Sequence, residues 1–178
     1  MRKIIYHIAT SIDGFIAGEN GSVSDFLMAG EHADEFVQSL SDYDTVIMGT
    51  NTYKFGFQFG LKAGEPAYPG LKHIIVSKSL TFESNGSVNL VSADELATLQ
   101  QLKQQAGKDI WLCGGGHLAG FMLKNNLIDE LVLKINPIIL GEGIKLFEGV
   151  GRSSVWQSAG SKSYSNGVVL QKYALQKS

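Results

Sequence analysis

A run of three glycines, Gly114 to Gly116, separates a strongly apolar segment from one with helical spacing. The apolar segment, Ile110 to Cys113, is typical of a buried strand, and the helical segment begins at His117 and Leu118. A strand that turns through glycine into a helix gathers free backbone amides and the positive end of the helix dipole at one place. Such places bind anions, above all a nucleotide pyrophosphate; glycines needed only for a tight turn are the alternative.

A second strand-like segment ends in the same kind of turn. Residues 44–49 are apolar and end in Gly49. Hydroxyl and amide side chains then open a helical turn, at Thr50, Asn51 and Thr52. These side chains are good ligands for phosphate oxygens, and an ordinary helix cap is the alternative.

A third strand-like segment, residues 73–77, ends in the hydroxyl of Ser77 and is followed by the cation Lys78. This pair suits a phosphate monoester such as the 2′-phosphate of NADP, and a solvated lysine is the alternative. Parallel strands place their carboxyl ends at one edge of a sheet, so three such turns can converge on one extended ligand. The sequence therefore predicts a dinucleotide site built from three strand ends.

Strands alternate with helices through most of the chain, and a hairpin follows. Strand-like apolar segments cover residues 3–10, 15–17, 44–49, 73–77, 110–113 and 130–135. Helical spacing covers residues 31–40, 50–54, 92–106 and 117–126, and alternation from Trp156 to Tyr173 across Asn166-Gly167 predicts the hairpin. This order predicts an α/β domain with a mixed, mainly parallel sheet covered on both faces.

Two local features refine these expectations. The residues Ser92-Ala93-Asp94-Glu95 match a capping box, so Ser92 is expected to cap the helix that follows while Glu95 reaches back. Residues 55–70 are rich in glycine, proline and aromatic residues without a clear period, which predicts a loop.

The composition excludes several classes of protein. The chain has 178 residues, 44% of them hydrophobic, which suits one domain over residues 1–178. A net charge of −2 without a basic run argues against nucleic acid as a partner. An apolar stretch of membrane-spanning length is absent from the sequence, so a cytoplasmic location is expected, with no membrane partner. The histidines show no metal-ligand spacing, and the single cysteine, Cys113, fits a buried inert thiol.

Five segments, in this order, resemble the dihydrofolate reductase superfamily. They are ATSIDGFIA at 9–17, VIMGTNT at 46–52, IVSKSL at 75–80, WLCGGGHL at 111–118 and PIILGEGIKLF at 137–147. The greater similarity is to the riboflavin-biosynthesis branch, whose reductase domain is fused or related to pyrimidine deaminases. The resemblance runs from about residue 3 to residue 175. It implies a dihydrofolate-reductase-like, three-layer α/β/α fold with a mixed, mostly parallel sheet and an antiparallel C-terminal hairpin.

The resemblance also implies NADPH as cofactor and hydride transfer from its nicotinamide. By the resemblance, the nicotinamide would lie beside Ala9 and Ile16, and the adenosine ribose with its 2′-phosphate beside Ser77 and Lys78. The cofactor phosphates would be held by Gly49, Thr50, Asn51 and Thr52. The pyrophosphate would be lined by Gly114, Gly115, Gly116, His117 and Leu118. Family members have a cis peptide in the glycine pair of this last loop. True dihydrofolate reductases generally have a basic residue where this chain has Thr50, so binding of the 2′-phosphate would depend more on Lys78.

Two carboxylates are candidates for a supporting catalytic role. Hydride transfer needs the donor carbon close to the acceptor and a proton source for the adjoining nitrogen. The resemblance suggests Asp13, in the SIDG turn, for substrate binding or proton relay, and Asp34, in the first helix, near the position of the acid in folate reductases. A plain turn and a favourable charge at a helix start are the respective alternatives. Glu142, in a glycine-rich loop, is a further candidate, with a solvent-facing position as its alternative.

The leading hypothesis is an NADPH-dependent reductase of the riboflavin-pathway type. Its substrate would be an aminouracil ribosyl phosphate, 5-amino-6-(5-phosphoribosylamino)uracil, or a related small heterocycle. The chain has only two arginines, Arg2 and Arg152, so a paralogue with another substrate is an alternative. A dihydrofolate or pteridine reductase that uses Asp34 is another, and an NADP-binding protein without turnover is a third. The hydrophobic C-terminal strands and Trp156 predict a homodimer.

Overall fold

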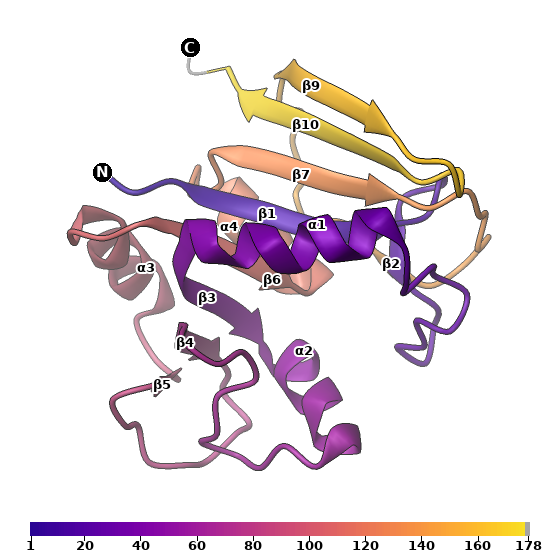
Figure 1. Ribbon diagram of the computed structural model, residues 1–178. Helices are drawn as coiled ribbons and strands as arrows, with labels where there is room; N and C mark the ends of the chain where they lie inside the picture. Colours follow the sequence, from indigo (N-terminus) through magenta and orange to yellow (C-terminus); the bar gives the residue numbers. More distant parts are fainter. Residues whose placement is uncertain (177–178) are drawn as a thin grey trace.

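An eight-stranded sheet in the order β5-β4-β3-β6-β1-β7-β10-β9 runs through the protein (Figure 1). The computed structural model describes residues 1–176. The strands are β1 (Ile4–Thr10), β3 (Tyr43–Gly49), β4 (Lys72–Val76), β5 (Val88–Val91), β6 (Asp109–Gly114), β7 (Glu130–Ile135), β9 (Trp156–Ser163) and β10 (Val169–Leu175). Neighbouring strands are parallel except where β10 pairs antiparallel with β7 and β9. The expected mixed sheet with a C-terminal hairpin is confirmed.

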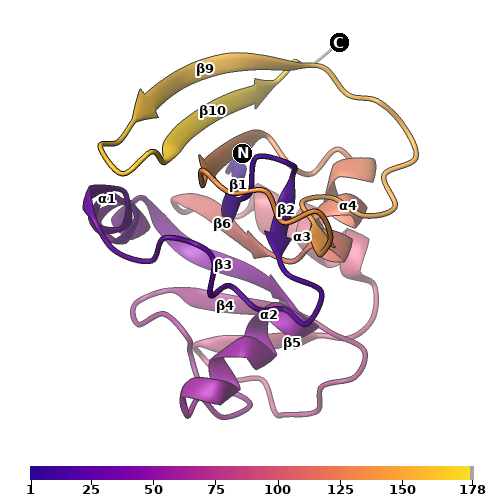
Figure 2. The same cartoon turned by 90° about the vertical axis from the view of Figure 1, so that its right-hand side faces the viewer.

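Helices cover both faces of the sheet, as Figure 2 shows with α1 on one side and α3 and α4 on the other. They are α1 (Glu31–Ser39), α2 (Thr50–Phe55), α3 (Glu95–Gln104) and α4 (Gly116–Lys124), with 3-10 turns η1 (Leu40–Asp42) and η2 (Gly56–Phe59). A separate two-stranded sheet joins β2 (Phe15–Ala17) to β8 (Ile144–Lys145). The architecture is the three-layer, dihydrofolate-reductase-like fold. None of the helices in residues 1–176 has the length and apolar character needed to span a membrane.

The strand alternation divides the core between the two layers of helices. In β1, Ile4 and Tyr6 pack with the residues of α3 and α4, whereas Ile5 packs on the other face with Val132 and Trp111. Successive residues of a strand point to opposite faces, so every second residue of β1 lies on the face covered by α1. The candidate site described below uses this face.

The structure corrects the predicted start of the third helix. Helix α3 begins at Glu95 after Asp94, whose φ of 52° is left-handed, and no side chain forms a capping hydrogen bond there. Glu95 instead forms an ion pair with Lys78, with 3.1 Å between Oε1 and Nζ. The capping box at Ser92 was therefore wrong, because a tertiary contact holds the glutamate that the local pattern assigned to capping.

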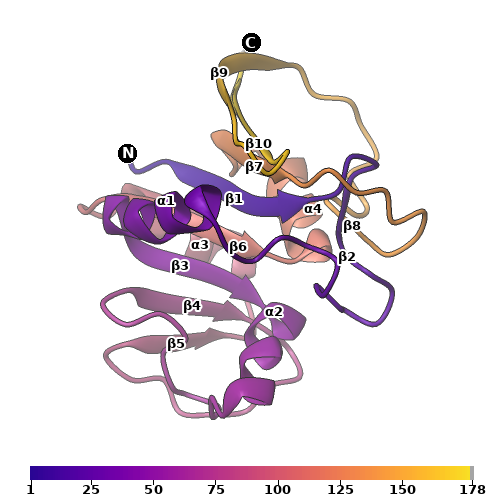
Figure 3. The same ribbon diagram turned by 45° about the vertical axis from the view of Figure 1, so that its right-hand side comes forward.

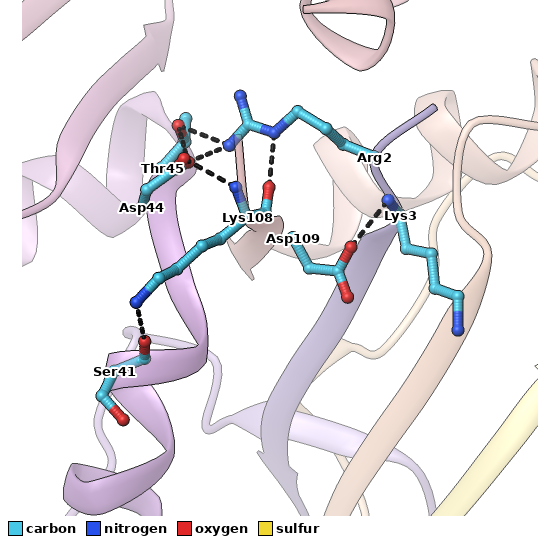
Figure 4. A network of polar contacts seen from close by, with 7 residues as sticks. All are labelled: Arg2, Lys3, Ser41, Asp44, Thr45, Lys108 and Asp109. Atoms are coloured by element: carbon cyan, nitrogen blue, oxygen red, sulfur yellow. Dashed lines mark hydrogen bonds and ion pairs between the residues drawn. The ribbon is translucent and has the colours of Figure 1, made fainter. Parts of the chain in front are cut away.

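A polar network ties together the amino ends of the central strands (Figure 4). The guanidinium of Arg2 pairs with Asp44 and donates a 2.9 Å hydrogen bond to the hydroxyl of Thr45. Asp44 also accepts the backbone N–H of Lys108 at 2.8 Å, and the Lys108 ammonium donates to the carbonyl of Ser41 at 2.7 Å. This network lies at the edge of the sheet opposite the carboxyl ends of the strands, so Arg2 serves the fold there.

Candidate functional site

The strand ends singled out in the sequence meet at the carboxyl edge of the sheet. Strand β3 lies between β4 and β6, and Figure 3 shows the arrowheads of β1, β3 and β4 on the same side of the molecule, where α2 begins. The hydroxyl of Thr50 donates a 2.7 Å hydrogen bond to Ser77 Oγ. A Cβ placed on Gly49 would lie 3.6 Å from the carbonyl oxygen of Gly114 and from the nitrogen of Gly115. The predicted convergence of three turns is thus present.

A cavity of about 1800 Å³ opens at this edge and continues between α1 and the sheet. Of the residues predicted to bind the cofactor, those in its lining are Ala9, Ile16, Gly49, Thr50, Asn51, Thr52, Lys78, Gly115, Gly116, His117 and Leu118. Pockets for ordinary small ligands have volumes of roughly 300–1,000 Å³. The cavity is therefore large enough for an extended ligand and a second small molecule.

The side chain of Ser77 supports the turn and does not line the cavity. Ser77 is 3% exposed, and its hydroxyl oxygen accepts hydrogen bonds from the Thr50 hydroxyl and from the backbone N–H groups of Ser79 and Leu80. Contact between Ser77 and the cofactor, as the resemblance implied, stays a prediction. Its role is to hold two of the strand ends together.

Lys78 lines the cavity, but its ammonium is engaged by a carboxylate. Its side chain is 77% exposed, and the ion pair with Glu95 places a negative charge on the same wall. A phosphate bound at Lys78 would compete with Glu95 for this ammonium. The electrostatic attraction for a 2′-phosphate is therefore smaller than a free lysine would provide.

The glycine loop brings the start of α4 close to the backbone of β8. The peptide between Gly114 and Gly115 is cis, as the resemblance implied, and α4 begins at Gly116. A Cβ on Gly116 would lie 2.2 Å from the carbonyl oxygen of Lys145, so only glycine fits without movement of the backbone. The first amides of a helix have no partner within the helix, and this turn lies in the cavity lining. The loop can therefore offer backbone donors to an anion.

His117 forms part of the rim of this loop. Its Nε2 lies 2.7 Å from Oε2 of Glu148, and its side chain is 90% exposed. Both residues line the cavity. His117 thus lies at the predicted pyrophosphate position, although its ring nitrogen is already paired with a carboxylate.

The two candidate catalytic carboxylates do not line the cavity. Asp13 is exposed and accepts backbone hydrogen bonds from Leu140 at 3.1 Å and Gly141 at 2.7 Å. A hydrogen bond with the Ser11 side chain, supported by these two amides, lowers the pKa of Asp13. Asp34 lies exposed in the first turn of α1. These positions favour the plain turn and the plain helix start over a catalytic role.

Glu142, the further candidate, is exposed and also lies outside the cavity lining. The carboxylates that do line the cavity are Glu19, Glu95 and Glu148. The last two are each paired with a cation at the rim, as described above.

The inner end of the cavity consists of residues to which the sequence analysis assigned no role in the site. It is lined by His7, Phe36, Tyr68, Trp111, Cys113 and Lys134, which come from α1, from three central strands and from the loop before β4. Cys113 is buried, as predicted, and burial raises the pKa of its thiol to about 12. The one signal in the sequence that could have indicated this inner end is Lys134, a lysine within the apolar run ELVLKI.

Two nitrogen-bearing side chains contact the ring of Phe36 at this inner end. The rings of His7 and Phe36 have centroids 5.0 Å apart, and Nζ of Lys134 lies 4.1 Å from the centroid of Phe36. Burial lowers the pKa of His7 to about 3 and also lowers the pKa of Lys134. His7 is therefore neutral near pH 7, and its Nε2 has no hydrogen-bond partner among residues 1–176.

Comparison with known proteins gives the chain a family. The family model of the RibD C-terminal domain matches residues 2–170. The uncharacterized protein YwjB of Bacillus subtilis (strain 168) is 31% identical over 173 residues, which cover 95% of this chain and 96% of that protein. The riboflavin biosynthesis protein RibD of Corynebacterium ammoniagenes is 27% identical over 150 residues, 78% of this chain and 44% of that protein.

A solved structure agrees with the fold over the full length. The crystal structure of a putative riboflavin biosynthesis protein from Shewanella sp. PV-4 superposes with a TM-score of 0.80 at 25% sequence identity. The match covers 99% of this chain and 100% of the other.

Proposed function

Because the chain belongs to the RibD C-terminal domain family, we propose that it is an NADPH-dependent reductase of the riboflavin-pathway type. Its substrate is an aminouracil ribosyl phosphate or a related small heterocycle. The observation that carries the proposal is the meeting of Gly49, Lys78 and Gly115 on one cavity. A ligand that touches all three must be long and must carry anionic groups along its length.

The residues along the outer part of the cavity suit NADPH. At Gly49, Gly115 and Gly116 the lining of the cavity is backbone, so a phosphate can approach the amides without meeting a Cβ. Asn51 adds a side-chain amide and Thr52 a hydroxyl to the same lining. The backbone and these side chains would hold the phosphates, and Lys78 would take the 2′-phosphate.

The inner part of the cavity suits a planar acceptor beside the nicotinamide. Ala9 and Ile16 line the cavity and would border the nicotinamide, where the small side chain of Ala9 leaves space for a ring. When bound, NADPH supplies the hydride. The aromatic side chains of Phe36, Tyr68 and Trp111 line this part and would shield a bound ring from water.

The charges in the cavity bear on the substrate class. Among residues 1–176, no arginine lines the cavity, because Arg2 lies at the opposite sheet edge and Arg152 bonds to the carbonyl of Lys124. A ribosyl phosphate would therefore find few cations. This supports including small heterocycles without a phosphate among the candidate substrates.

The decisive experiment is a titration of the protein with NADPH and NADH, followed by a search for substrates. NADPH should bind, and candidate heterocycles should cause loss of the nicotinamide absorbance. Lys78→Met should weaken NADPH binding while leaving NADH binding unchanged, and Lys72→Met, at the start of β4, serves as the matched control. Failure to bind either nucleotide would exclude the proposal. Binding without oxidation by any heterocycle would identify a nucleotide-binding protein without turnover.

A further inference from the structure

The inner end of the cavity holds one cation, Lys134, which lies between α1 and the sheet. Its ammonium contacts the face of the Phe36 ring, and it is partly buried. Four other lysines among the described residues have carboxylate partners, namely Lys3, Lys78, Lys103 and Lys162. Among the residues described, Lys134 forms no ion pair.

Strand register places Lys134 at the reacting end of the cavity. In the parallel pair of β1 and β7, Ala9 is opposite Lys134, and His7 is opposite Val132. Val132 packs on the α1 face, so Lys134, two residues further along β7, lies on that face as well. The ammonium is thus carried by the residue next to Ala9, where the proposed function puts the nicotinamide.

The surroundings leave the charge of Lys134 uncompensated. His7 is neutral near pH 7, and burial raises the pKa of the Cys113 thiol, so that group is neutral too. Of the three carboxylates that line the cavity, Glu95 and Glu148 are paired at the rim, and Glu19 is exposed in the loop after β2. Placing an ammonium in a poorly hydrated site without a counter-charge costs free energy, which contact with an aromatic face offsets only in part. An anionic ligand atom would remove this cost.

We propose that Lys134 is the specificity-determining residue of the cavity and binds an anionic oxygen of a planar heterocyclic substrate. The inference rests on the proposed function for the position of the reacting ring, and it deepens that function by naming the substrate class. Phe36 and Trp111 line the cavity beside Lys134 and pack edge-to-face, with ring centroids 5.5 Å apart, so the surface around the ammonium is aromatic. The substrate is therefore a ring that carries a carboxylate or an ionised carbonyl oxygen.

The test compares ligands that differ in one charge. Calorimetric titrations use orotate against uracil, and benzoate against benzamide, each with and without saturating NADP⁺. A charge-assisted hydrogen bond contributes about 1.5–3 kcal/mol, so the wild-type protein should bind the carboxylate of at least one pair about tenfold more tightly or better. Lys134→Met should abolish this preference while retaining the affinity for the neutral ligand, and Lys134→Arg should restore part of it.

The matched control is Lys172→Met. Lys172 lies opposite Val132 on β10 and contributes to the electrostatic potential at His7, but it is exposed and outside the cavity lining. Its variant should keep the preference for the carboxylate. If Lys134→Met keeps that preference, or if neither pair shows one in the wild-type protein, the inference is overturned. A protein that prefers the carboxylates through Lys134 but binds no NADPH would instead exclude the proposed function alone.

Discussion

The hydroxyl of Thr50 donates a 2.7 Å hydrogen bond to the hydroxyl oxygen of Ser77, and this bond joins the ends of β3 and β4. Ser77 is almost completely buried and also accepts backbone N–H groups from the turn that follows it. The contact therefore sets the distance between two of the turns that form the outer cavity. Through this contact the buried hydroxyl of Ser77 fixes the geometry of the site.

Replacing Ser77 by alanine should affect both stability and nucleotide binding. The variant leaves the Leu80 N–H and the Thr50 hydroxyl without their acceptor, which should lower the free energy of unfolding by about 1–3 kcal/mol. NADPH should bind more weakly because the Thr50 turn is no longer fixed. Urea unfolding and nucleotide titration measure the two effects. Ser87→Ala, at an exposed position, should change neither.

The turn into α4 should tolerate no side chain at Gly116. A Cβ there would meet the carbonyl of Lys145 at 2.2 Å, so Gly116→Ala should displace the backbone and destabilise the protein by about 1–3 kcal/mol. The same displacement should weaken NADPH binding. Gly86→Ala is the control, because nothing lies within 4 Å of a Cβ at that position. Equal stability and affinity in the two variants would contradict the geometry of this loop.

The stability of the protein should fall as acid protonates the unfolded chain at His7. Burial lowers the pKa of His7 from 6.5 to about 3, so between these values the unfolded state binds a proton that the folded state does not. This difference should remove about 1.4 kcal/mol of stability per pH unit below the unfolded pKa. His7→Phe should flatten the pH dependence of urea unfolding between pH 6 and pH 4, roughly the interval set by that shift.

Asp44 should matter for stability but not for the site. It pairs with Arg2, a nearly buried guanidinium, and accepts the backbone N–H of Lys108 (Figure 4). Asp44→Asn should cost about 3 kcal/mol, because it leaves the buried cation without its partner. NADPH affinity should stay at the wild-type value, since the network lies at the opposite sheet edge. Thermal unfolding and nucleotide titration test this, with Asp42→Asn, an exposed carboxylate nearby, as the control.

Local patterns in the sequence were sufficient to predict most of the helices and strands and the turns that form the outer cavity. The turns at Gly49 and at Gly114 to Gly116 are visible because strand, glycine and helix start follow one another directly along the chain. Strand β5 was missed because its four residues, VNLV, include a polar residue and lie between polar segments typical of loops. The capping box at Ser92 was wrong because Glu95 is held by Lys78, a contact between residues far apart in the sequence.

The sequence by itself determined the order of strands and helices, the mainly parallel sheet and the backbone turns that favour an anionic cofactor, because these depend on periodicity and on residue types close together in the chain. Only the tertiary structure decided which side chains face the cavity. Asp13 and Asp34 lie outside it, whereas His7 and Lys134 meet at Phe36 within it. These positions follow from strand register, which joins residues more than a hundred positions apart, and from the packing of α1 on the sheet, and both leave almost no trace in local sequence.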